Sequence, residues 1–252
     1  MNSAASIEQQ VRSHYPHALS ETAFRDRVFQ FLDKEHCGNV SRVLLAIAQC
    51  ADDVNAVHDA DVTLVKRHFR GNLLGPFEMG GLAGIPYAGL TGISTIAHHI
   101  PDGGSALIVY GPHIYGPHIG ITDQGDLGKL LRPGQHLESA ACGSLTLAVR
   151  HLGSSPDYQP RDDEDDAEQM LLERRLLPYR DEILSAAHPL KAATNVAYTL
   201  IHELIHRYLR ARKDEFRCES LVLAGGVAIN TDARHADYVD LRHLSTLRLA
   251  EI

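Results

Sequence analysis

Apolar residues along the chain fall into two patterns. Some recur at three- and four-residue intervals, which is typical of amphipathic helices, and others form short continuous runs bounded by glycine or turn residues, which is typical of buried strands. The helical intervals predict helices over residues 21–34, 55–68, 93–100, 137–152, 162–187 and 190–212. The clearest predicted strand is SALIVY at residues 105–110, and a second opens the segment 219–230 before a turn. The run at 40–49 fits either a buried strand or a buried helix turn, because periodicity does not separate the two.

The alternation of these segments predicts the fold class. Strands separated by helices form a mostly parallel sheet that helices cover on both faces. A chain of 252 residues, 44% of them hydrophobic, is long enough for one large core and short for two. We therefore expect a single α/β domain over residues 1–252, with a helical segment at about residues 1–36.

The charge balance excludes several classes of partner. The net charge is -8, and no basic cluster with interleaved aromatic residues offsets it, so we expect neither nucleic acid nor an anionic membrane as a partner. The first 25 residues lack the apolar stretch of a secretory signal. No run approaches the roughly 18 apolar residues of a membrane span. We expect a cytoplasmic protein.

One conspicuous motif is HELIH at residues 202–206. It matches the H-E-x-x-H pattern, in which two histidines on one helix face bind zinc and the glutamate acts as a base. Such a site needs a third ligand, and the residues from Arg207 to Arg210 stand where the extended pattern has glycine and histidine. Glu219 and Glu251 are distant candidates without a supporting motif. An amphipathic helix produces the same pattern without metal, so a zinc hydrolase is an alternative function only.

A glycine-rich stretch at residues 80–92 offers a second candidate. It lacks the lysine of the phosphate-binding GxxxxGK[ST] loop and does not fit the dinucleotide pattern GxGxxG. We interpret it as backbone that packs closely beside a site.

The chain has four cysteines, Cys37, Cys50, Cys142 and Cys218, none in a C-x-x-C pair. In a reducing compartment we expect no disulfide framework, and a single cysteine is most simply a small buried side chain.

Two of the cysteines and a histidine occupy positions suited to chemistry. Cys50 ends an apolar run and His113 follows the strand at 105–110, and α/β proteins gather ligands at the carboxyl ends of strands. Cys142 lies near a predicted helix start, where a thiolate is favoured. Two thiolates and one imidazole leave tetrahedral zinc one open position for water, whose pKa then falls to about 7.

The chain also resembles a known family. The segment GGLAGIPYAGLTGISTIAHHIPDGGSALIVYGPHI at residues 80–114, with CADDVN upstream and AACG downstream, is similar to the limiting-CO2-inducible B protein family. GGVAINT at residues 225–231 fits the last strand of that family. Members of the family resemble β-type carbonic anhydrases in fold and active site. The resemblance runs from about residue 24 to residue 241.

The resemblance implies a carbonic anhydrase in which zinc-bound hydroxide attacks CO2 to give bicarbonate, in a homodimer. It implies zinc ligands at Cys50, the GPH histidine and Cys142, and an aspartate, Asp52, that accepts a hydrogen bond from the zinc-bound water. In β-type enzymes an arginine orients this aspartate. The Cys-x-Asp-x-Arg spacing is not met, because position 54 is Val54, and Arg70 is one candidate for the role.

Two histidines are candidates for the same ligand position, because YGPHI occurs at residues 110–114 and again at 115–119. His113 keeps its distance from the preceding strand, and His118 keeps the downstream sequence. We favour His113, because its strand fixes it more tightly. His98 and His99 lie in the same family-like stretch and are either proton shuttles or packed side chains.

A second function stays open. Some members of the family lack activity, and the missing arginine spacing and the duplicated segment both raise that possibility here. The alternative is a catalytically inactive zinc-binding subunit that responds to CO2 or bicarbonate.

Overall fold

The computed structural model describes residues 4–36, 40–52, 73–116, 128–130, 135–137, 139–231 and 236–252. The helices are α1 (Ala4–His14), α2 (Glu21–His36), α4 (Gly89–His99), α5 (Gly143–Leu152), α6 (Ala167–Leu176), α7 (Arg180–Ser185) and α8 (Pro189–Arg212). The strands are β1 (Leu19–Ser20), β2 (Val43–Ala48), β3 (Leu74–Glu78), β4 (Ser105–Tyr110), β5 (His113–Tyr115), β6 (Lys129–Leu130), β7 (Ser139–Ala140), β8 (Ser220–Asn230) and β9 (Tyr238–Arg248).

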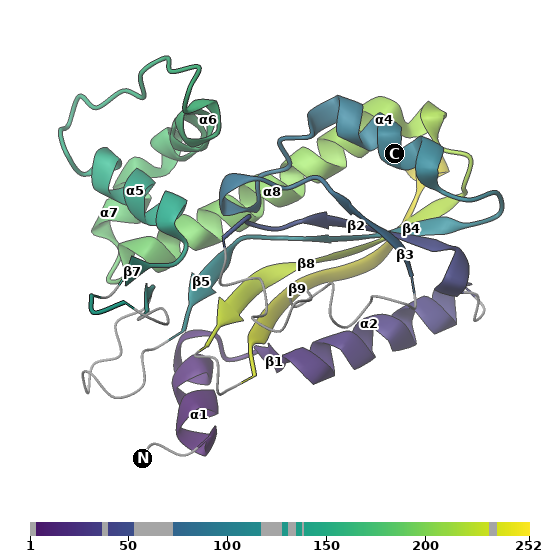
Figure 1. The fold of residues 1–252 in the computed structure, drawn as a ribbon, viewed down its shortest axis with the longest axis horizontal. Helices are drawn as coiled ribbons and strands as arrows, with labels where there is room; N and C mark the ends of the chain where they lie inside the picture. The colour runs from purple at the N-terminus through teal and green to yellow at the C-terminus, as the bar shows by residue number, and fades with distance from the viewer. Residues whose placement is uncertain are drawn as a thin grey trace.

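A central sheet lies between two layers of helices, with α1 and α2 on one face and α4 and α8 on the other (Figure 1). The strand order is β1-β9-β8-β4-β2-β3, and β5 pairs with β8 beyond the end of β4. Strands β3, β2, β4, β8 and β5 are parallel, whereas β9 and β1 run antiparallel to their neighbours. The predicted fold class, an α/β protein with a mostly parallel central sheet, is confirmed.

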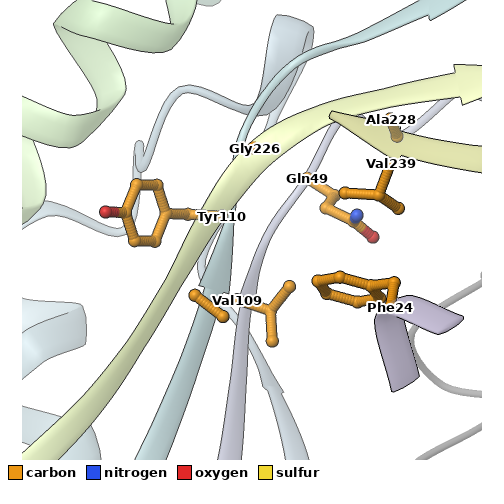
Figure 2. Close-up of a pocket in the computed structure, with 8 residues that line it drawn as sticks. Phe24, Gln49, Val109, Tyr110, Gly226, Ala228 and Val239 are labelled. Carbon is orange, nitrogen blue, oxygen red and sulfur yellow. The ribbon is translucent and has the colours of Figure 1, made fainter. Parts of the chain in front are cut away.

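Each central strand contributes to two apolar cores. In β4, Val109 belongs to the core under α2, whereas Tyr110 belongs to the core that contains α4, α5 and α8. Figure 2 shows this division, with Tyr110 on the opposite side of the strands from Phe24 and Val239. Because both faces are covered, these strands read as continuous apolar runs, and β4 was predicted on that basis. The run at 40–49, which fitted a strand or a helix turn, contains the strand β2.

A kink at Gly111, where β4 leads into β5, lies against Gly226 of β8. Gly111 has a φ of 146°, and a Cβ at this position would lie 1.7 Å from the carbonyl oxygen of Gly226. The β8–β9 pairing shifts register between Gly225 and Gly226, next to this contact. Any side chain at Gly111 would therefore push the two strands apart.

The kink changes the face that the chain presents. Val109 packs in the core of α2, and Ile114 packs with α1 on the same side of the sheet. A regular strand would place these two residues on opposite faces, because they are five positions apart. The kink therefore turns His113 away from α1 and α2.

Three predicted elements were wrong in extent. The helix expected over 137–152 begins only at Gly143, because Ser139 and Ala140 pair with β6 instead. The helix expected over 162–187 breaks into α6 and α7, with Pro178 in the turn between them. The segment 219–230 forms one strand, β8, rather than a strand and a turn, because a bulge accommodates its two glycines. The helix expected over 55–68 lies outside the described residues.

None of the described helices combines the length and the apolarity that a membrane span requires.

Candidate metal centre

Cys50, His113 and Cys142 lie together beyond the carboxyl ends of the parallel strands. Cys50 follows β2, His113 begins β5, and Cys142 caps the amino end of α5. Their sulfur atoms and a ring nitrogen all lie within 4.8 Å of one another, and all three side chains are buried. The structure thus brings together three residues that are up to 92 positions apart in the sequence.

The two cysteines form a close but unbonded pair. Their Sγ atoms are 3.6 Å apart, which is far beyond the roughly 2.05 Å of a disulfide. The hydrogen bond between the two side chains lowers the pKa of Cys142 and, together with burial, raises the pKa of Cys50. A metal ion that displaced the thiol protons would have two thiolate ligands.

Two further polar groups contact these sulfurs. The backbone N–H of Ala83 donates to Cys50 Sγ at 3.2 Å, and the hydroxyl of Ser144 lies 3.0 Å from Cys142 Sγ. Ala83 belongs to the glycine-rich stretch, in which a Cβ at Gly84 would lie 2.5 Å from the carbonyl oxygen of Gly111. The glycines therefore let this loop lie against the centre, as the sequence indicated.

His113 is oriented by one nitrogen and open at the other. Its Nδ1 donates to Oδ1 of Asn230 at 2.8 Å, and its side chain is 1% exposed. Its Nε2 is buried and has no hydrogen-bond partner among the described residues. Burial alone would lower the pKa of His113, but the charge and close side-chain contact of Cys142, followed by the bond to Asn230, raise it overall. A buried ring nitrogen without a hydrogen-bond partner is costly, and a metal ion would satisfy it.

Asp52 lies beside His113 in the same cluster. Its Oδ2 is 3.8 Å from His113 Nε2, and its side chain is 11% exposed. The carboxylate therefore stands beside the position that an ion between the three ligands would occupy, with partial access to solvent. The position at which β-type enzymes have the orienting arginine, here Val54, lies outside the described residues. So do Arg70, the candidate for that role, and His118.

A second layer holds the histidine in place. Asn230 ends β8, and its Nδ2 donates to Asp237 Oδ2 at 3.2 Å. The backbone N–H of Thr231 donates to the other carboxylate oxygen at 2.7 Å. Burial raises the pKa of Asp237 to about 6. Sequence analysis placed this strand but missed Asn230 as a site residue. A polar residue at the carboxyl end of an apolar strand was the available signal.

His98 and His99 do not join this centre. They end α4, and a short loop leads from them into the amino end of β4, whereas the cysteines lie beyond the opposite ends of the strands. Nδ1 of His98 bonds the carbonyl oxygen of Ser94, and the ring of His99 packs edge-on against Phe77.

The HELIH segment lies on α8, where His202 and His206 meet a third histidine, His243 of β9. The two glutamates considered from sequence, Glu219 and Glu251, are not part of this group. Sequence analysis missed His243 because it stands in a strand that was not predicted.

Comparison with known proteins identifies the family of the chain. The model of the limiting CO2-inducible proteins B/C β-carbonic anhydrases matches residues 18–248. The solved structure of PtLCIB4, a homologue of the limiting CO2-inducible protein LCIB, is 27% identical, covers 96% of each chain and gives a TM-score of 0.84. LCIB itself is 18% identical over 92% of this chain and 94% of its own, with a TM-score of 0.63, and so shares the fold. No curated protein matches the chain. The family match covers most of the sequence, and the chain therefore belongs to the limiting CO2-inducible B/C β-carbonic anhydrase family.

Proposed function

We propose that the protein interconverts CO2 and bicarbonate with a zinc ion held by Cys50, His113 and Cys142. The observation that carries this proposal is the buried Cys-His-Cys set, in which Nε2 of His113 has no partner among the described residues. Thiolate and imidazole are the donors that zinc prefers, and three protein ligands are typical of catalytic rather than structural zinc. Zinc at such a site lowers the pKa of a water molecule to about 7 and so supplies a nucleophile at neutral pH.

The side chains around the ligands have separate roles in this proposal. Asn230 accepts from Nδ1 of His113, which leaves Nε2 as the ligating nitrogen. Asp52 accepts a hydrogen bond at its carboxylate and thereby orients the reacting water toward CO2. The proton released when CO2 and water become bicarbonate leaves to solvent, which the 11% exposure of Asp52 allows.

Stopped-flow CO2 hydration by the zinc-loaded protein, from pH 7 to 9, tests the activity. We expect hydration well above the buffer rate. Cys50→Ser should lose both hydration and the metal at this site. Asp52→Asn should keep the metal and lose about 10²- to 10⁴-fold in rate, the usual range for a positioned proton acceptor.

Two outcomes would contradict parts of the proposal. If zinc occupied the cysteine site without hydration above buffer, the enzyme claim would fail and the inactive, CO2- or bicarbonate-responsive zinc-binding subunit would be favoured. If His118→Ala lost the metal at this site and His113→Ala kept it, the histidine ligand would be the second copy instead.

A further inference from the structure

A second set of potential ligands lies between α8 and β9. The ring nitrogens of His202, His206 and His243 lie within 4.8 Å of one another, the same limit that the Cys50 set meets. The ring centroids are 4.4 Å apart for His202 and His206, 4.9 Å for His202 and His243, and 5.8 Å for His206 and His243. Tetrahedral zinc with bonds of 2.0–2.1 Å holds its ligand nitrogens about 3.3 Å apart, so small side-chain rotations would close the site.

The sheet provides a recess for this cluster. Tyr110 of β4, Gly225 of β8 and His243 of β9 are register partners in one row across three strands. Side chains in such a row share a face, and Tyr110 faces α8. A Cβ at Gly225 would lie 2.4 Å from the Tyr110 ring, so only glycine lets the ring lie across this position.

Two of the three histidines are oriented through one ring nitrogen. Nδ1 of His202 is hydrogen bonded to the Tyr110 hydroxyl at 2.7 Å, and Nε2 of His243 to the hydroxyl of Ser245 at 2.7 Å. These bonds leave Nε2 of His202 and Nδ1 of His243 for a ligand. Nε2 of His206 is buried and has no hydrogen-bond partner among the described residues. Metal-bound histidines are usually oriented in this way by their second nitrogen.

Burial lowers the pKa of each of the three histidines. Burial, followed by the neighbouring histidines and Arg210, lowers the pKa of His206 to about 4. Burial also lowers the pKa of His202 and of His243, although the Glu203 carboxylate acts in the opposite direction on His202. Burial therefore favours the uncharged imidazole in this cluster, and neutral imidazole is the ligand form.

We propose that His202, His206 and His243 form a second metal site, which binds zinc or another divalent first-row transition ion. Imidazole suits zinc, copper, nickel and cobalt, and three protein ligands leave one position for an exchangeable ligand. A bound ion would link α8 to β9, two elements that β8 separates along the chain. The site shares no ligand with the proposed catalytic centre, so it stands whether or not the protein hydrates CO2.

Cobalt(II) titration of the metal-free, full-length protein separates the two sites. We expect two equivalents for the wild type, and one each for His206→Ala, His243→Ala and the double variant Cys50→Ser with Cys142→Ser. The thiolate-to-cobalt charge-transfer band should remain in the two histidine variants and vanish in the cysteine variant. His17→Ala, which removes an exposed histidine outside both clusters, should still bind two equivalents.

A stability measurement in the cysteine double variant gives a second readout. Zinc should raise its Tm, because an ion that binds only the folded state stabilises that state. The rise should disappear when His243→Ala or His243→Gln is added, provided that circular dichroism shows a folded chain. A single cobalt equivalent in the wild type, or no zinc-dependent rise in Tm in the cysteine double variant, would overturn the second site.

Discussion

The side-chain oxygen of Asn230 lies 2.8 Å from Nδ1 of His113, and the amide group of Asn230 is itself fixed by Asp237. This chain of contacts decides which nitrogen of the histidine is available to a metal. Through Asn230, it also connects His113 to the buried carboxylate of Asp237.

Asn230→Ala should weaken zinc binding at the cysteine site by about 10- to 100-fold, the usual cost of losing a contact that orients a ligand. Competition with a chelator of known affinity measures the change, in a background where His206→Ala removes the second cluster. Thr199→Ala, an exposed position on α8, is the matched control and should leave the affinity unchanged. Equal affinities for the Asn230 variant and the control would mean that the contact does not position His113.

Asp237 should make stability depend on pH. Its folded pKa is raised from 3.8 to about 6, so the folded state binds the proton more tightly than the unfolded state does. Its contribution therefore falls as pH rises from about 4 to about 6, by up to about 3 kcal/mol, and is constant above that range. Urea unfolding of the metal-free wild type and Asp237→Asn at pH 4, 5, 6 and 7 tests this. The variant should gain stability relative to the wild type across that interval, and a flat difference would contradict the shift.

Gly111→Ala should destabilise the fold by more than about 4 kcal/mol, because its Cβ would lie 1.7 Å from a backbone oxygen that cannot move aside cheaply. Any folded fraction should bind less zinc at the cysteine site, since His113 follows the kink. Thermal unfolding and metal content measure both effects. Gly153→Ala is the control, because its Cβ would meet its neighbours at 3.5 Å or more. If both variants unfolded at the same temperature, the close approach of Gly111 to Gly226 would not be a constraint.

We expect the buried carboxylate of Glu173 to stabilise the folded protein. Its side chain accepts hydrogen bonds from Gln169 at 2.8 Å and from the Tyr158 hydroxyl, and it pairs with His151 at 2.8 Å. Glu173→Leu would leave the buried amide of Gln169 without this partner, at a cost of about 1–3 kcal/mol. Urea unfolding measures the loss, with Glu182→Leu on the exposed face of α7 as control. Equal stabilities would show that solvent replaces these bonds.

The fold and the cysteines could be predicted from sequence for a simple physical reason. The strands β4 and β2 are covered on both faces, so their apolar runs are unbroken and mark the positions of His113 and Cys50 at their ends. Pro178 also marks the helix break in the sequence, because proline disfavours a helix interior, and the predicted continuous helix over 162–187 ignored this signal.

The contacts around these residues were not predictable in the same way. The β9 strand is only half-buried, and its sequence lacks a continuous apolar run, so neither the strand nor His243 was expected. The role of Asn230 depends on β5 pairing with β8, and the face of His113 depends on the contact between Gly111 and Gly226. Both are relations between segments more than 100 residues apart, which no local pattern records.

Tyr115 and Asn230 form the last register pair of β5 and β8. The second YGPHI unit begins at Tyr115, the last residue of β5, so the first unit contains the whole approach to β5 and holds His113 opposite Ala228. The same five residues inserted before His113 would displace it from that partner, and a single added residue would turn its ring to the other face. A duplication that begins at Tyr115 therefore leaves the register of His113 unchanged.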